Sequence, residues 1–265
     1  MFPLRDHTPS QNVPFVTISL IVLNSVIYIY TLQIIDLAEF QTLLLRFGVL
    51  PAAWPEDGNF NTLFTYMFMH AGFLHLVGNM MFLWVFGDNL EHQMGPFWYL
   101  VFYLSCGVVA AVVHAIALPH SEQPLIGASG AIFGVMGAYF LLYPRAKIDI
   151  LVILIIIPRI FTISALWLLG GRLALDVFWV LQADTNLSQV AHWAHIGGFA
   201  AGLILCLPLW LALGATAFWR SAPTAPPKPA SNQGRPRNKT RSGPRGDARA
   251  QKKPATSGKS GPWGK

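Results

Sequence analysis

The chain has 265 residues, of which 54% are hydrophobic and 11% are charged, and its formal net charge is +6. This composition excludes a soluble globular protein, and the length excludes a single membrane anchor. We therefore expect an all-α polytopic membrane protein. The positive charge belongs to the C-terminal tail, because residues 220–265 hold twelve of the eighteen Lys and Arg residues.

A membrane-spanning helix needs about 20 predominantly apolar residues. Six segments supply such spans, namely residues 13–35, 72–91, 97–118, 126–143, part of 148–182, and 190–214. We predict a cytoplasmic N-terminal segment at 1–12, a six-transmembrane-helix domain at 13–219 and a tail at 220–265. The tail is rich in Pro, Gly, Ser, Lys and Arg, so it buries too little apolar surface to fold and is expected to be disordered.

Basic residues predict the orientation of these spans. Arg5, Arg145, Lys147 and Arg220 share one side with the tail, whereas the loop at 36–71 carries four acids against one arginine. Positive charge favours the cytoplasmic side, so both termini are expected there. A basic run directly after a spanning helix is expected to contact anionic membrane lipids, and nucleic acid is the less economical partner.

The second predicted span begins with polar residues on an apolar background. His75 and Asn79 are four residues apart and share one helix face, so both can donate hydrogen bonds to a developing negative charge. His70 is either a junction residue that bonds locally or a functional group. An HExxH motif is absent and no carboxylate lies within one turn of either histidine, so we expect no metal.

The fourth span begins with Gly127-Ala128-Ser129-Gly130, an alcohol framed by glycines. Backbone N–H groups at the start of a helix can support an oxyanion, so Ser129 is a candidate nucleophile. The glycines at 130, 134 and 137 equally predict close helix packing. Both interpretations can hold together.

The segment 148–182 is too long for one simple span, and Pro158 interrupts it. Either the span is 148–170, or 148–158 lies at the membrane interface and the span is about 161–182. The second interpretation is favoured because it places Arg172 and Asp176 four residues apart, where their charges compensate each other inside the bilayer.

The sixth span carries His195, followed by Gly198 and Gly202. Two glycines four residues apart let this helix approach the glycine stripe of the fourth span. That approach would bring His195 within hydrogen-bond reach of the Ser129 hydroxyl, where it can act as a base. His192, three residues earlier, is the alternative base.

Taken in order, these motifs resemble those of the rhomboid intramembrane serine proteases over about residues 13–214. The matching motifs are HxxxxHxxxN at His70, His75 and Asn79, FGDNLE at 86–91, GASG around Ser129, and AHIGGFAAG around His195. The resemblance implies a six-helix rhomboid fold with a Ser129 and His195 dyad. It also implies an oxyanion hole made by His75, Asn79 and the backbone N–H of Ser129. Supporting roles then fall to His70, Gly127, Gly130, Phe133, Gly198 and Gly202, with Phe133 packing against the catalytic histidine.

The resemblance carries further expectations. The family needs no third acid, and no Asp or Glu is recognisable in the sequence as orienting His195. Asn61 and Thr62 stand where many bacterial members carry a Trp-Arg pair, which leaves the anchoring of the first loop open. Glu91 is implied to tie the second span to its neighbours. No cofactor is expected.

The implied substrates are transmembrane proteins, cleaved near the extracytoplasmic end of a helix beside a small side chain. A bacterial inner (plasma) membrane is the expected location. Two alternatives are a catalytically silent rhomboid-like protein that binds transmembrane clients, and a transporter or channel lined by the intramembrane polar residues.

Overall fold

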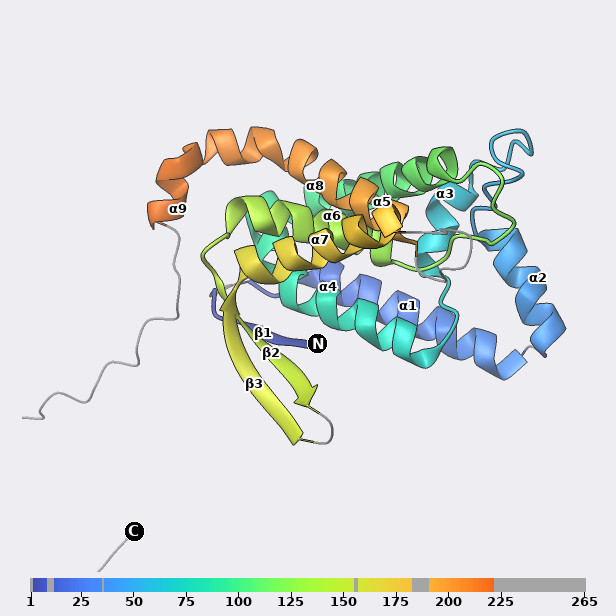
Figure 1. Ribbon diagram of the computed structural model, residues 1–265, viewed down its shortest axis with the longest axis horizontal. Helices are drawn as coiled ribbons and strands as arrows, with labels where there is room; N and C mark the ends of the chain where they lie inside the picture. Colours follow the sequence, from blue (N-terminus) through green and yellow to red (C-terminus); the bar gives the residue numbers. More distant parts are fainter. Residues whose placement is uncertain (1, 9–11, 35, 155–156, 183–190, 222–265) are drawn as a thin grey trace, which may run out of the picture. The chain divides into compact units, whose positions relative to one another are not determined.

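The computed structural model describes residues 2–8, 12–34, 36–154, 157–182 and 191–221. The elements follow one another as β1 (Phe2–Asp6), α1 (Phe15–Ile34), α2 (Leu37–Phe47), α3 (Thr62–Thr65), η1 (Tyr66–Phe68), α4 (Phe73–Met94), α5 (Pro96–Ala117), α6 (Ser129–Leu142), β2 (Lys147–Leu154), β3 (Ile157–Ser164), α7 (Ala165–Gln182), α8 (His192–Ala212), η2 (Ala215–Ala217) and α9 (Phe218–Ser221) (Figure 1). The predicted disordered tail lies outside the described residues except for its first two.

Each predicted span overlaps one long helix, and these are α1, α4, α5, α6, α7 and α8. By length and composition, α1, α5, α7 and α8 can each cross a membrane within the described part of the chain. Segment 62–68 and α4 meet the same requirement together, although they are bent by 98° where they join. With 14 residues, α6 extends only about 21 Å, less than a bilayer core. That all six helices span the membrane therefore remains a prediction.

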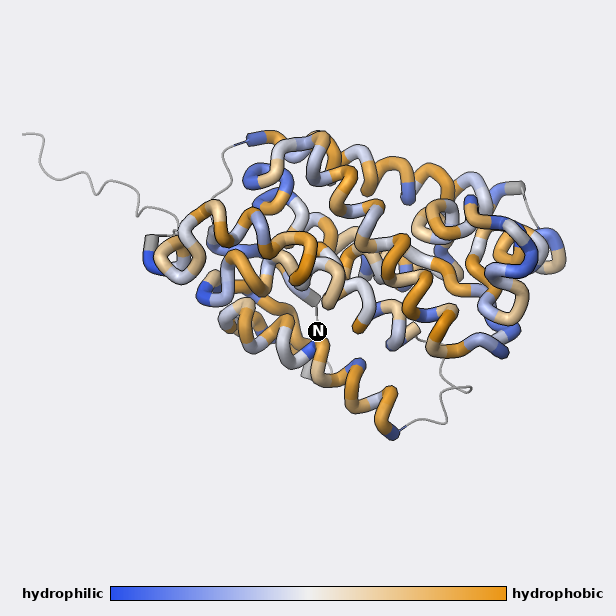
Figure 2. The backbone as a smooth tube through the Cα atoms, turned by 90° about the horizontal axis from the view of Figure 1, so that it is seen from above, coloured by the Kyte–Doolittle hydropathy of each residue, from blue (hydrophilic) through white to orange (hydrophobic). Residues whose placement is uncertain are grey.

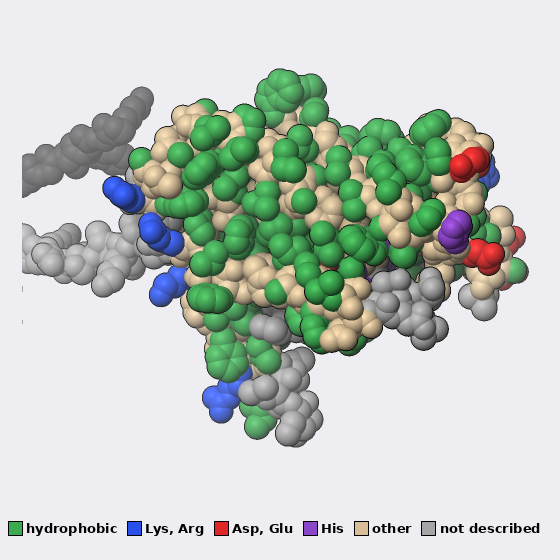
Figure 3. Space-filling model, turned by 45° about the horizontal axis from the view of Figure 1, so that its top comes forward, with side chains coloured by type: hydrophobic (Ala, Val, Ile, Leu, Met, Phe, Trp, Pro, Cys, Tyr) green, Lys and Arg blue, Asp and Glu red, His purple; other side chains and the backbone are tan. Residues whose placement is uncertain are grey.

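Hydrophobic residues predominate along the helices in Figure 2, and hydrophobic side chains cover much of the face that Figure 3 shows. Large apolar side chains are exposed on several helices, among them Val22, Val26, Trp98, Trp167, Trp179 and Ile204. Soluble proteins rarely expose apolar patches of this extent. Lipid is the environment that suits such a surface. The exposed apolar side chains therefore indicate an integral membrane protein.

The all-α prediction is wrong in one region, where β1, β2 and β3 form an antiparallel sheet in that order. The β2–β3 hairpin covers most of 147–164, so the span at 148–170 is also wrong, and α7 begins at Ala165. Runs of Ile and Val favour strands, and Pro158 disfavours a continuous helix because proline lacks the N–H that a helical hydrogen bond needs. The favoured alternative, a span at about 161–182, is closer, because α7 covers Ala165–Gln182 and begins four residues later than predicted.

The sheet is attached to one end of the helices through Asp6. The Asp6 carboxylate accepts hydrogen bonds from Asn89 of α4 at 2.6 Å and from Tyr139 of α6 at 2.5 Å. Arg145 donates to the backbone of Trp219 at the same end. Lys and Arg gather at this end in Figure 3, while acidic side chains lie chiefly at the opposite end. The charge asymmetry expected from the sequence therefore has a spatial counterpart.

Glu91 joins α4 to α1. Its buried carboxylate accepts hydrogen bonds from the backbone N–H groups of Val16 and Thr17, each at 2.8 Å, and from the Thr17 hydroxyl at 2.9 Å. An anion at the first turn of a helix is stabilised by the free N–H groups there. The implied tie between the second span and its neighbour is confirmed.

The core is organised around α6, most of whose residues are buried. It packs against α8 where glycines face each other. A Cβ atom added to Gly198 would collide with the carbonyl oxygen of Gly130, and one added to Gly202 would collide with that of Gly134. The backbones of α6 and α8 are therefore in direct contact, as the spacing of the glycines predicted.

Candidate active site

Ser129 is the first residue of α6, and the preceding turn depends on glycine. Gly127 has φ +105°, a conformation that side chains rarely allow, and its N–H donates to the Tyr66 carbonyl at 2.9 Å. A Cβ atom at Gly127 would also lie 2.7 Å from the His75 ring. Both the backbone turn and the close neighbour therefore require glycine at position 127, two residues before Ser129.

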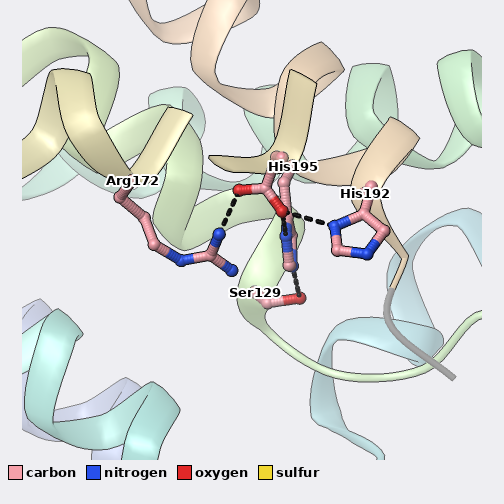
Figure 4. Close-up of polar contacts among 5 residues, drawn as sticks. Ser129, Arg172, His192 and His195 are labelled. Carbon is pink, nitrogen blue, oxygen red and sulfur yellow. Dashed lines mark hydrogen bonds and ion pairs between the residues drawn. The ribbon is translucent and has the colours of Figure 1, made fainter. Parts of the chain in front are cut away.

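His195 lies in the first turn of α8, directly beside Ser129. Its Nε2 atom is 3.0 Å from Ser129 Oγ (Figure 4), and its side chain is buried. The Phe133 ring stacks on the imidazole with 4.1 Å between the ring centroids and an angle of 3°. Helices α6 and α8 thus bring the hydroxyl and imidazole together, as the glycine spacing predicted, and the ring lies flat against Phe133, a contact that the family resemblance implied.

One expectation is wrong, because an acid does lie within hydrogen-bond distance of His195. Asp176 Oδ1 lies 3.0 Å from His195 Nδ1, whereas Ser129 contacts the other ring nitrogen, Nε2. The carboxylate comes from α7, and the sequence signal for it was already visible as the Arg172–Asp176 pair. In the sequence, that pair predicts only mutual charge compensation, because nothing there indicates which way α7 faces.

The carboxylate of Asp176 is fully buried and has three partners. Arg172 Nη1 donates to Oδ2 at 2.5 Å, which confirms the predicted compensation. His192 Nδ1 lies 2.6 Å from Oδ1, the oxygen that His195 also contacts. His192 therefore bonds Asp176, and His195 is the histidine that contacts the Ser129 hydroxyl.

Three groups here could also hold a metal ion. Asp176, His192 and His195 offer ligand atoms that all lie within 4.8 Å of one another. The Arg172 guanidinium already occupies the second oxygen of the same carboxylate, and its positive charge opposes a divalent cation. This arrangement favours the hydrogen-bonded network over metal ligation.

The polar residues of α4 face the turn before Ser129. Both the His75 ring and Asn79 Nδ2 lie next to Gly127. Within the described residues, the buried Asn79 Nδ2 has no hydrogen-bond partner. The His70 ring is 5.1 Å from that of His75 and lies in the break between η1 and α4, at the predicted junction.

Comparisons with known proteins identify the family of this chain. The model of the Rhomboid domain matches residues 57–212, which include every site residue named above. RHOMBOID-like protein 5 of Arabidopsis thaliana is 28% identical over 175 residues, 63% of this chain and 50% of that protein. Rhomboid protease GluP of Bacillus subtilis (strain 168) is 28% identical over 168 residues, 63% of this chain and 30% of that protein.

A third relative, RHOMBOID-like protein 6, mitochondrial, of Arabidopsis thaliana, is 32% identical over 150 residues, 54% of this chain and 41% of that protein. The chain thus spans half or less of the length of each of these three relatives. The Rhomboid domain nevertheless covers more than half of the chain itself, and on that match the chain belongs to the rhomboid family.

Proposed function

We propose that the protein is an intramembrane serine endopeptidase that cleaves transmembrane segments of other membrane proteins. The observation that carries the proposal is the 3.0 Å contact between Ser129 Oγ and His195 Nε2 within a bundle of apolar helices. Nucleophile and base within hydrogen-bond reach are the signature of covalent catalysis. Polar side chains within membrane-spanning segments cost free energy, so they are typical of functional sites.

In the proposed reaction, His195 takes the proton of the Ser129 hydroxyl as the oxygen attacks a peptide carbonyl. His195 then returns that proton to the leaving amine, and an acyl-enzyme remains on Ser129. Water, activated by His195, hydrolyses this ester and regenerates the serine. Neither step needs a metal or a cofactor.

Negative charge on the tetrahedral intermediate would be stabilised at the start of α6. The backbone N–H of Ser129 is free of helical bonding there, and Asn79 Nδ2 is a buried donor beside the same turn. His75, next to Gly127, would add a further donor. Donors positioned before the charge develops stabilise the transition state more than the bound substrate.

Asn79→Ala is expected to lower kcat by about 100-fold, because one oxyanion donor contributes about 3 kcal/mol to transition-state stabilisation. KM should change little, since the amide contacts the substrate oxygen mainly after it becomes charged. His75→Ala should act in the same direction. Steady-state cleavage of a single-span substrate measures both constants. A rise in KM with kcat unchanged would assign Asn79 to substrate binding instead.

The proposed orientation places Ser129 toward the extracytoplasmic side. Ser129 and the basic residue Arg145 lie at opposite ends of α6, and the basic end is assigned to the cytoplasm. A helical substrate hides its carbonyls in hydrogen bonds, so cleavage requires the outer end of the substrate helix to unwind. Both termini would then be cytoplasmic, and a bacterial inner membrane is the proposed location.

The silent alternative is disfavoured by the site itself. A protein that only binds clients has no need of a serine hydroxyl bonded to a histidine, or of the stacked Phe133 ring that fixes this histidine. A transporter would need a polar path across the bilayer. In the described residues, Ser129, His75 and Asn79 instead meet at one turn, next to Gly127.

A fluorophosphonate probe tests the proposal directly. We expect purified wild-type protein to be labelled and to cleave a single-span substrate, with the cut mapped by mass spectrometry. Ser129→Ala should lose both activities. Ser25→Ala is the matched control, because the Ser25 hydroxyl donates a hydrogen bond to the Ile21 carbonyl at 2.8 Å within α1, outside the candidate site. Labelling that persists in Ser129→Ala would refute the assignment of the nucleophile.

A further inference from the structure

We propose that Asp176 is a positioning residue for catalysis, which fixes the tautomer and orientation of His195 and is itself held in place by Arg172 and His192. This inference rests on the proposed peptidase function and extends the Ser129–His195 pair to a third helix, α7. It assigns a chemical role to a carboxylate that the sequence suggested was only the counter-ion of an arginine.

The packing of α7 gives the first reason. Only Ala165, Leu169 and Asp176 are buried along this helix, and they lie on one face at spacings of four and seven residues. Its other faces expose large apolar side chains such as Trp167 and Trp179. A buried charge makes the packing of α7 against its neighbours less stable than an apolar side chain would, because the charge must lose its water of hydration. Asp176 therefore needs an explanation beyond helix packing.

The hydrogen bonds give the second reason. Oδ1 of Asp176 accepts from the Nδ1–H of His195 at 3.0 Å, while Oδ2 accepts from Arg172. A proton held on Nδ1 leaves Nε2 unprotonated, and this is the atom 3.0 Å from Ser129 Oγ. The tautomer of an imidazole follows from the partner of its other nitrogen, so Asp176 presets His195 as the proton acceptor for Ser129.

Arg172 and His192 prevent the carboxylate from moving. Arg172 also lies over the Phe133 ring, with its Cζ atom 5.0 Å from the ring centroid. Phe133 in turn stacks on His195, so the guanidinium contacts both the carboxylate and the aromatic platform. When His195 takes the serine proton, the imidazolium faces a fixed negative charge without any reorganisation of the site.

Asp176→Asn tests the proposal in the full-length protein. The amide keeps the size of the side chain but can present an N–H to His195, which would place the ring proton on the wrong nitrogen. We expect kcat to fall at least about 100-fold with KM within about two-fold of wild type, and the second-order rate of fluorophosphonate labelling to fall in parallel. Asp149→Asn is the matched control, since Asp149 pairs with Arg5 in the sheet outside the site.

A purely structural role predicts different results. If Asp176 only tethers α7, Asp176→Asn would loosen the helix and leave labelling as fast as in wild type, or faster. The double variant Arg172→Leu with Asp176→Leu removes both charges together, so no unpaired charge is left buried. We expect it to recover thermal stability relative to Asp176→Leu alone while turnover stays at least about 100-fold low. Recovery of turnover as well would overturn the proposal.

The same assays separate this inference from the proposed function. A wild-type protein that neither cleaves nor takes the probe would refute the peptidase assignment, and the positioning role would fail with it. A wild-type protein that is active, with Asp176→Asn equally active, would refute only the role of Asp176.

Discussion

His195→Ala is expected to lower kcat by on the order of 10⁴-fold or more, and to slow fluorophosphonate labelling by a similar factor. The imidazole is the proton acceptor in direct contact with the Ser129 hydroxyl, so without it the serine must attack as a neutral alcohol. The protein should remain folded, because the buried Asp176 keeps Arg172 and His192 as partners. Steady-state cleavage, labelling and thermal unfolding in detergent measure the three quantities.

Two other histidines serve as controls for this experiment. His192→Ala should reduce turnover far less, about ten-fold, because His192 acts on Asp176 and not on the serine. His120→Ala should leave turnover unchanged, since His120 is exposed in the turn after α5. Losses of equal size in His192→Ala and His195→Ala would mean that the two imidazoles act as one unit, contrary to the separate roles assigned here.

The sequence predicted the helices better than the segments between them. Apolar runs of about 20 residues have few alternatives to a spanning helix, so each of the six long helices overlaps a predicted segment, with α4 ending three residues later and α5 beginning one residue earlier than predicted. The β2–β3 hairpin was missed because its residues are as apolar as those of a span. In the structure, β2 pairs with β3 and also with β1, more than 140 residues away in sequence, and the apolar run itself indicates neither pairing.

The pairing of Ser129 with His195 could be predicted because glycine spacing encodes contact between helices. Small residues four apart on two helices define one close approach, and the residues one turn away are then neighbours. The role of Asp176 could not be predicted in this way. Helix α7 has no glycine contact of comparable closeness with α8. Arg172 and Asp176 are four residues apart in this helix, so the sequence already offers each charge a partner and indicates no contact with another helix. Only the rotation of α7 about its axis, visible in the structure, places Asp176 against His195.

Adding one methyl group at the closest helix contact should damage the whole site. Gly202→Ala improves helix propensity, yet its Cβ atom would collide with the backbone of Gly134, which has no side chain that could move aside. The helices α6 and α8 must separate to admit it, and we expect a loss of about 1 to 3 kcal/mol in the free energy of unfolding.

Activity should fall with stability, because the same two helices carry Ser129 and His195. A displacement of about 1 Å between nucleophile and base can lower turnover by about 100-fold. Gly171→Ala is the matched control, since a Cβ atom at Gly171 meets nothing within 4 Å and α7 should gain about 1 kcal/mol from the substitution. If thermal unfolding in detergent showed both alanine variants to be equally stable, close contact between α6 and α8 would not be what holds the serine and histidine together.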